Sequence, residues 1–168
     1  MSFLSRSDDL PEAYEPPAPA FLPDPWAEAL RRRAAELVGL ALLALGAALA
    51  AALASHHPED PSFFNATAEA PRNWLGLPGA TVADPMARTL GLAAWAAAAV
   101  LLVWGLRLIL HRGDARSWSR LALSPVAVLV AAAALSTHVP PEGWAAPHGL
   151  GGLVGDAAGR ELFALSPW

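Results

Sequence analysis

The sequence predicts an all-α integral membrane protein with three transmembrane helices and a structured extracytoplasmic loop between the first two. Three observations lead to this prediction. Apolar residues make up 55% of the 168 residues, charged residues make up only 15%, and the mean hydropathy is +0.37. Because a soluble domain carries roughly 25% charged residues, the shortfall indicates a bilayer environment.

Missing residue types exclude several function classes. The chain has no Lys, so it cannot carry a phosphate-binding P-loop, which needs one. It has no Cys, which excludes disulfides, thiolate nucleophiles, iron–sulfur clusters and Cys-ligated zinc. The net charge of −4 argues against a nucleic-acid-binding surface, which would be basic. We therefore expect no cofactor and no enzymatic chemistry in this chain.

The first thirty residues are acidic and rich in proline. Proline removes backbone donors and like charges repel, so this composition is typical of disorder. We expect residues 1–30 to form a cytoplasmic tail, either a solvated leader or a partner-binding segment.

Three apolar runs are predicted to cross the bilayer. The first, 31–55, opens with three Arg and is long enough to cover about 30 Å at 1.5 Å per residue. Asp84-Pro85 predicts the start of the next helix, because Asp caps free backbone N–H groups and Pro suits the first helical position. The second span then covers 87–110, and the third covers 121–137.

The distribution of Arg predicts the orientation of the chain. Seven Arg cluster at the start of the first span and around the basic loop 111–120, whereas Arg72, Arg88 and Arg160 lie toward the other side of the membrane. The positive-inside rule therefore places the N-terminus and the 111–120 loop in the cytoplasm. The 56–86 loop and the 138–168 segment then lie outside, the latter with a short interfacial helix. We expect a multi-pass protein of the bacterial inner membrane.

Two features of the spans allow more than one interpretation. Glu36 is the only acid inside a span, and it is either a functional intramembrane acid or a boundary residue paired with the preceding Arg. Small residues repeat at Gly46, Ala50 and Ala54, and again within 93–99. They indicate helix packing, unless they only reflect the abundance of Ala.

His56-His57, followed by Glu59 and Asp60, resembles a metal-binding set. Adjacent His side chains diverge in most backbones, and no third nitrogen ligand is near in the sequence. Plain exposed polar residues are the alternative interpretation, and we expect no metal here.

The loop 56–86 has the residue types of a shaped loop. Gly76 and Pro78-Gly79 indicate tight turns, and Asp84 is expected to cap the helix that follows. A shaped external loop is a candidate partner surface. Its candidate contact residues are Asp60, Pro61, Ser62, Asn73, Gly76, Pro78, Gly79, Ala80 and Asp84.

This loop resembles the N-terminal membrane domain of FtsK/SpoIIIE-type DNA translocases. In that family an Asp-Pro-Ser turn follows the first span, and an Asn-x-x-Gly-x-Pro-Gly-Ala-x-x-Ala-Asp stretch precedes the second. The positions listed above match this pattern, together with Ala83. Gly151-Gly152-Leu153-Val154-Gly155 resembles a further family motif, and the likeness covers about residues 31–165.

The resemblance implies a membrane anchor and divisome-assembly domain of a motor that acts in cell division and chromosome segregation. It implies contacts with membrane lipid, with other integral membrane proteins of the divisome type and with further copies of the chain. It implies no direct nucleic-acid contact by this segment. The family has four spans, so a fourth is expected beyond Trp168, in a longer protein. The alternative is a small accessory subunit of a larger respiratory or photosynthetic membrane complex.

Overall fold

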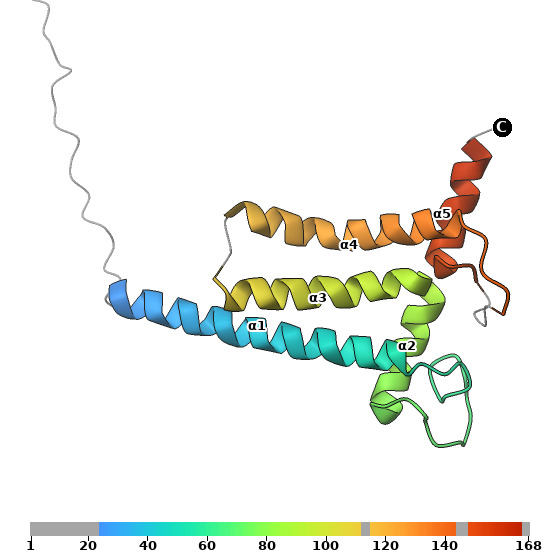
Figure 1. Ribbon diagram of the computed structural model, residues 1–168, viewed down its shortest axis with the longest axis horizontal. Helices are drawn as coiled ribbons and strands as arrows, with labels where there is room; N and C mark the ends of the chain where they lie inside the picture. The colour runs from blue at the N-terminus through green and yellow to red at the C-terminus, as the bar shows by residue number, and fades with distance from the viewer. Residues whose placement is uncertain (1–23, 112–114, 144–147, 166–168) are drawn as a thin grey trace, which may run out of the picture.

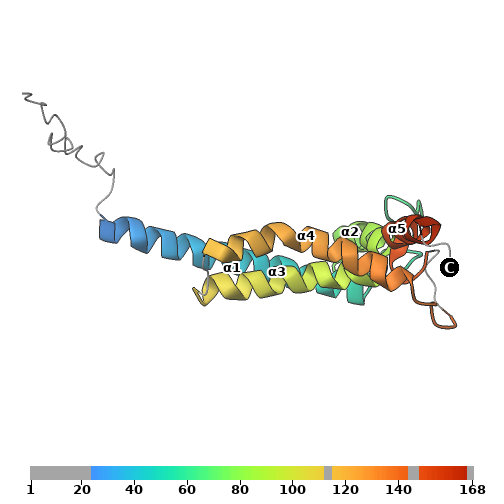
Figure 2. The same ribbon diagram turned by 90° about the horizontal axis from the view of Figure 1, so that it is seen from above.

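The computed structural model describes residues 24–111, 115–143 and 148–165, and every regular element in these ranges is a helix. The helices are α1 (Asp24–Ala54), α2 (Gly76–Leu90), the 3-10 turn η1 (Gly91–Ala93), α3 (Ala94–Ile109), α4 (Ala115–Ser136) and α5 (Gly152–Leu165). The long helices α1, α3 and α4 lie side by side, with α3 between the other two (Figure 1). The short helices α2 and α5 gather at one end of this bundle (Figure 2), which we call the capped end.

Glycines bring α1 and α3 into close contact. A Cβ atom added to Gly39 would lie 2.7 Å from the carbonyl oxygen of Gly105, and one added to Gly105 would lie equally close to the carbonyl oxygen of Gly39. Gly46 packs in the same way against Leu102, with 2.9 Å from its hypothetical Cβ to Leu102 Cγ. The predicted packing role of Gly46 is confirmed, whereas Ala54 is exposed. Close backbone approach of this kind gives membrane helices their packing contacts.

A bend at Gly91 separates α2 from α3. Gly91 has a φ of +57°, in the left-handed region that favours glycine. A side chain there would also clash with the backbone at Leu150, whose carbonyl oxygen accepts a hydrogen bond from Leu92 N at 2.9 Å. A Cβ atom at Gly151 would clash with the backbone carbonyl of Ala132 in α4. The Gly-Gly motif thus fastens α5 to both η1 and α4.

Two helical stretches in the described part of the chain are long and apolar enough to cross a bilayer. They are Pro25–Ala54 and Gly76–Ile109, and Leu121–Ser136 is a shorter apolar helix. The bend at Gly91 leaves η1 and α3 as the bundle portion of the second stretch, while α2 lies across the capped end (Figure 1). That the third apolar helix crosses the bilayer stays a prediction.

Several helices begin earlier than the sequence predicts. Residues 24–30, expected in the disordered tail, form the first turns of α1, where Glu28 and Arg32 pair one turn apart. Residues 115–120, expected in the basic loop, belong to α4. The rest of the predicted tail, residues 1–23, and residues 112–114 of the loop lie outside the described residues.

The predicted helix start at Asp84-Pro85 is wrong. Helix α2 begins at Gly76, and Pro85 lies inside it. Pro78 takes the place expected of Pro85, in the first turn, where a missing N–H costs no helical hydrogen bond. Helix α2 continues past Pro85 because Gly79, Ala80, Ala83 and Asp84 are buried at the capped end. Tertiary packing therefore overrides the local Asp-Pro signal, and residues 76–86 are helical and not loop.

At the other end of the bundle, Glu36 joins α1 to the end of α3. One carboxylate oxygen accepts a hydrogen bond from Arg33 Nη1 at 2.8 Å, and the other lies 3.6 Å from His111 Nε2. About a third of the Glu36 side chain is exposed. This geometry confirms that Glu36 pairs with a preceding Arg, and its place at the membrane boundary stays a prediction.

Candidate functional site

All nine predicted contact residues lie at the capped end, in the loop that follows α1 and in α2. The polar members of the set are more buried than a contact surface requires. Asp60, Asn73 and Asp84 are each no more than 4% exposed, and Gly79 and Ala80 are buried as well. Pro61, Ser62 and Gly76 are half-buried, and only Pro78 is exposed. The matching residues therefore form an internal framework beneath the surface of the loop.

Asp60 closes the loop on itself. Its two carboxylate oxygens accept the backbone N–H groups of Arg72 and Asn73, each at 2.9 Å. Buried backbone donors need such partners, and charge-assisted hydrogen bonds are the stronger ones. The Asp60 carboxylate therefore joins the two ends of the loop. In the residues that the structure describes, no group of three or more His, Asp and Glu side chains is arranged to hold a metal ion.

Asn73 fastens the loop to the end of α1. Its Nδ2 donates to the carbonyl oxygens of Ala52 at 2.8 Å and Ser55 at 3.2 Å, and its Oδ1 accepts the N–H of Leu75 at 3.1 Å. The last carbonyls of a helix lack intrahelical partners, and Asn73, at the far end of the loop, supplies the hydrogen-bond donor for two carbonyls at the end of α1. Ser55 adds to this, because its hydroxyl donates to Ala51 and accepts the N–H of Trp74 at 3.0 Å.

Gly79 lies directly against Asn73. A Cβ at Gly79 would overlap the Asn73 amide oxygen and lie 2.7 Å from Leu75 Cβ. The prediction that Gly79 forms a tight turn is wrong, because it lies within α2 and its role is to leave room. Gly76 has the left-handed conformation, with a φ of +64° and open space around its hypothetical Cβ. The two glycines thus serve different physical needs.

Asp84 joins α2 to the loop. One carboxylate oxygen accepts the Ser62 hydroxyl at 2.5 Å, and the other accepts Arg88 Nε at 2.7 Å. Ser62 Oγ also accepts the N–H groups of Phe64 and Asn65, each at 3.1 Å, and the Arg88 guanidinium lies 5.7 Å from the Phe64 ring centroid. The buried carboxylate is therefore paired and hydrogen-bonded on both sides, as a buried charge requires.

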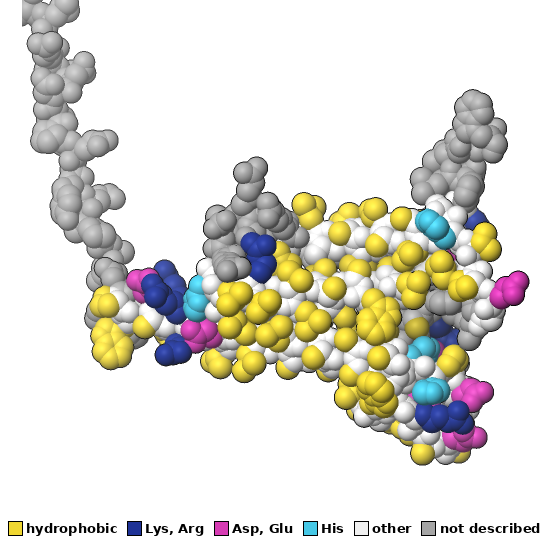
Figure 3. Space-filling model, viewed as in Figure 1, with side chains coloured by type: hydrophobic (Ala, Val, Ile, Leu, Met, Phe, Trp, Pro, Cys, Tyr) yellow, Lys and Arg dark blue, Asp and Glu magenta, His cyan; other side chains and the backbone are white. Residues whose placement is uncertain are grey.

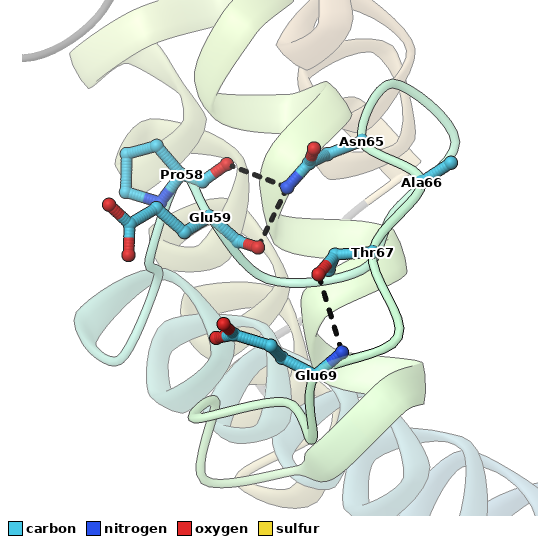
Figure 4. A pocket seen from close by; sticks show the side chains of 6 residues that line it. All are labelled: Pro58, Glu59, Asn65, Ala66, Thr67 and Glu69. Atoms are coloured by element: carbon cyan, nitrogen blue, oxygen red, sulfur yellow. Dashed lines mark hydrogen bonds between the residues drawn. The ribbon is translucent and has the colours of Figure 1, made fainter.

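Asn65 forms a second support that the sequence prediction missed. Its Nδ2 donates to the carbonyl oxygens of Glu59 at 2.7 Å and Asp60 at 3.2 Å. These bonds shape an open hollow of about 560 Å³ between Pro58, Glu59, Asn65, Ala66, Thr67 and Glu69 (Figure 4). Ser55 and Arg88 were missed as well. The affinity of Asn and Ser side chains for local backbone groups was the one available signal for Asn65 and Ser55.

His56 lies between α1 and this framework with its Nδ1 buried and without a hydrogen-bond partner among the described residues. Burial lowers the pKa of His56 below its ordinary value of 6.5. Asp84 and Asp60 act to raise this pKa, and Arg88 and His57 act to lower it. The net result favours the neutral imidazole in the folded protein.

The lowered pKa of His56 predicts a loss of stability in mild acid. Below pH 6.5 the unfolded chain binds a proton at His56 that the folded chain does not, so the free energy of unfolding falls as pH drops from 6.5 to the folded pKa. Unfolding in detergent, measured from about pH 7.5 to about pH 5, should show this slope. His56→Gln should flatten it, and the exposed neighbour variant His57→Gln should retain it. Equal slopes in the two variants would contradict the prediction.

Comparison with known proteins identifies the family. Residues 31–165 match the family model described as the 4TM region of DNA translocase FtsK/SpoIIIE. The chain belongs to the FtsK/SpoIIIE family. The matched region is the family's membrane region and not its motor, and the protein is accordingly a membrane protein. No solved structure matches the chain.

Curated relatives of the FtsK/SpoIIIE family give the same result. The chain is 39% identical over 144 residues to the DNA translocase FtsK of Bradyrhizobium diazoefficiens, which covers 86% of this chain and 18% of that protein. It is 41% identical over 132 residues to that of Brucella melitensis, covering 78% and 16%, and 35% identical over 119 residues to that of Caulobacter vibrioides, covering 67% and 14%. The chain therefore spans less than a quarter of the length of these relatives.

Proposed function

We propose that this chain is the membrane anchor and divisome-assembly domain of a DNA translocase, with no chemistry in this segment. The family match over residues 31–165 is the observation that carries the proposal. The fold supports it, because the polar groups at the capped end are used in hydrogen bonds and ion pairs that shape the loop. The chain acts through helix packing and through the shape of the loop surface at the capped end.

The proposed orientation places the N-terminus in the cytoplasm and the capped end outside, in the bacterial inner membrane. The clustering of Arg at the α1 start and beyond α3 supports it. Figure 3 is in keeping with this arrangement, since Arg side chains lie near the start of α1 and apolar side chains cover the visible length of the bundle.

The proposed partners are membrane lipid, integral membrane proteins of the divisome and further copies of the chain, with no nucleic acid bound by this segment. Because Asp60, Asn73 and Asp84 are buried, we place protein contacts on the exposed surface that they support. That surface includes the rim of the hollow in Figure 4, where Glu59 and Glu69 are exposed and form ion pairs with Arg72.

Recruitment to the division site tests this function. A fluorescent fusion of the protein in its own host should concentrate at the septum. Gly79→Val should reduce septal recruitment while membrane insertion persists, because the added side chain displaces Asn73 and deforms the loop. Gly76→Asn is the matched control, since Asn tolerates the left-handed conformation.

Two outcomes would count against the proposal. A wild-type fusion spread evenly around the cell envelope would contradict septal assembly and favour an accessory subunit of another membrane complex. Normal recruitment of Gly79→Val, with its loop shown to be deformed by increased protease cleavage, would exclude the loop as the contact surface.

A further inference from the structure

An apolar cleft lies in the angle between α1 and α2. Helix α2 crosses the end of α1 and extends past it (Figure 1). The face of α2 that carries Val82 and Met86, which we call its underside, is therefore turned toward the bundle surface. The cleft has a volume of about 240 Å³, and its lining includes Leu45 and Leu49 of α1, Val82 and Met86 of α2, Leu75 and Leu101. Every described residue that lines it is apolar, so water gains no hydrogen bond from a side chain there.

The cleft is continuous with the lipid-facing surface of the bundle. Leu45, on the outer side of α1, is 57% exposed and lines the cleft at one edge. Val82, at the other edge, is 46% exposed. Figure 3 shows apolar side chains covering the visible bundle surface and reaching the capped end, where charged side chains gather farther out. A lipid chain that lies along α1 therefore meets no polar barrier before α2.

The charged groups of α2 point away from this underside. Asp84 is buried against Ser62, and Arg88 pairs with Asp84. Neither lines the cleft. Trp74, beside Leu75 at the start of α2, is 75% exposed, and Trp rings are favoured at the boundary between lipid and water. An apolar face that the charged side chains avoid, with a Trp beside it, is typical of a helix that lies in a membrane interface.

We propose that α2 lies in the membrane interface and that acyl chains of the leaflet at the capped end fill the cleft between α1 and α2. This goes beyond the anchoring function, because it assigns lipid contact to a segment whose sequence predicts a water-exposed loop. Hydrocarbon is the occupant that the lining fits, since the cleft offers contact area and no polar partner.

The absence of Cys allows a direct test by spin labelling. Single variants Val82→Cys, Leu77→Cys, Leu45→Cys and Glu69→Cys would be labelled in the full chain, reconstituted in phosphatidylethanolamine–phosphatidylglycerol vesicles. Electron paramagnetic resonance then compares the accessibility of each label to oxygen, which partitions into lipid, and to a water-soluble nickel complex. Leu77 is the matched control, because it lies on the same helix and is 51% exposed but does not line the cleft.

The label at Val82 should show an oxygen-to-nickel accessibility ratio close to that at Leu45 and severalfold above those at Leu77 and Glu69. A ratio at Val82 as low as that at Glu69 would overturn the proposal by placing the underside of α2 in water. Shielding of Val82 from both reagents would overturn it in favour of a protein occupant. Leu75→Cys, at the other end of the same apolar lining, repeats the test if the Val82 variant does not fold.

Discussion

Replacing Gly79 with alanine is expected to release the loop from α1 and to lower the free energy of unfolding by about 3 kcal/mol, the sum of an overpacked site and lost hydrogen bonds. The added methyl group would overlap Oδ1 of Asn73. Asn73 is buried and holds the carbonyls of Ala52 and Ser55, so it cannot move aside without giving up those bonds. The change adds one methyl group, and its effect depends wholly on how close Gly79 lies to Asn73.

Detergent unfolding and protease protection of the loop measure this effect. Gly76→Asn should cost much less, because Gly76 has open space around it and Asn tolerates its backbone conformation. If Gly79→Ala unfolded like the unaltered protein and kept its loop protected, the Gly79–Asn73 contact would not be what holds the loop.

Replacing Arg88 with methionine is expected to cost about 3 kcal/mol, at the lower end of the range for breaking a buried ion pair. Asp84 is only 2% exposed, so loss of its cation leaves a buried carboxylate whose remaining side-chain hydrogen-bond partner, among the residues that the structure describes, is Ser62. Arg88 itself is 29% exposed, which reduces the expected cost. The Phe64 ring would also lose its cation.

Arg72→Met is the matched control for this prediction. Arg72 forms ion pairs with Glu59 and Glu69 through exposed side chains, and such surface pairs contribute about 0–1 kcal/mol. The double variant Asp84→Leu/Arg88→Met should be more stable than the sum of the single effects predicts, because removing both charges leaves neither unpaired. Additive losses would show that the two residues do not act as a pair.

The spans were the part of the fold that local composition predicted. Apolar runs with few charges need no long-range contact to be recognised, and Pro25–Ala54 and Gly76–Ile109 cover all but the last residue of each of the first two predicted spans. Helix ends were predicted less well. Asp84-Pro85 has the local signal of a helix start, yet burial of Ala80 and Ala83 carries α2 back to Gly76. A local signal does not report which face of a helix will be covered.

The sequence predicted the nine positions as a contact surface, whereas in the structure only Pro78 among them is exposed. The residues of the Asp-Pro-Ser turn and of the Asn-to-Asp stretch do come together. The carboxylates of Asp60 and Asp84 and the amide of Asn73 are buried, which residue type alone does not predict. Ser55, Asn65 and Arg88 complete the network. The partner of Ser55 is Trp74, which is distant in the sequence, whereas Asn65 and Arg88 bond to residues within about one helical turn or a short loop of themselves.

The sequence by itself determined that the chain is an α-helical membrane protein of the FtsK/SpoIIIE family without P-loop or thiol chemistry, because composition and motif spacing are local properties. Only the tertiary structure decided that α2 turns across the end of the bundle and that Asp84 is buried. It also decided that Gly79 leaves room for Asn73, whereas Gly76 provides a left-handed backbone conformation. The bend at Gly91 and the burial of Asp84 depend on contacts between residues far apart in the chain, Leu92 with Leu150 and Ser62 with Asp84. Such contacts follow from how the helices pack, and packing is a property of the whole fold.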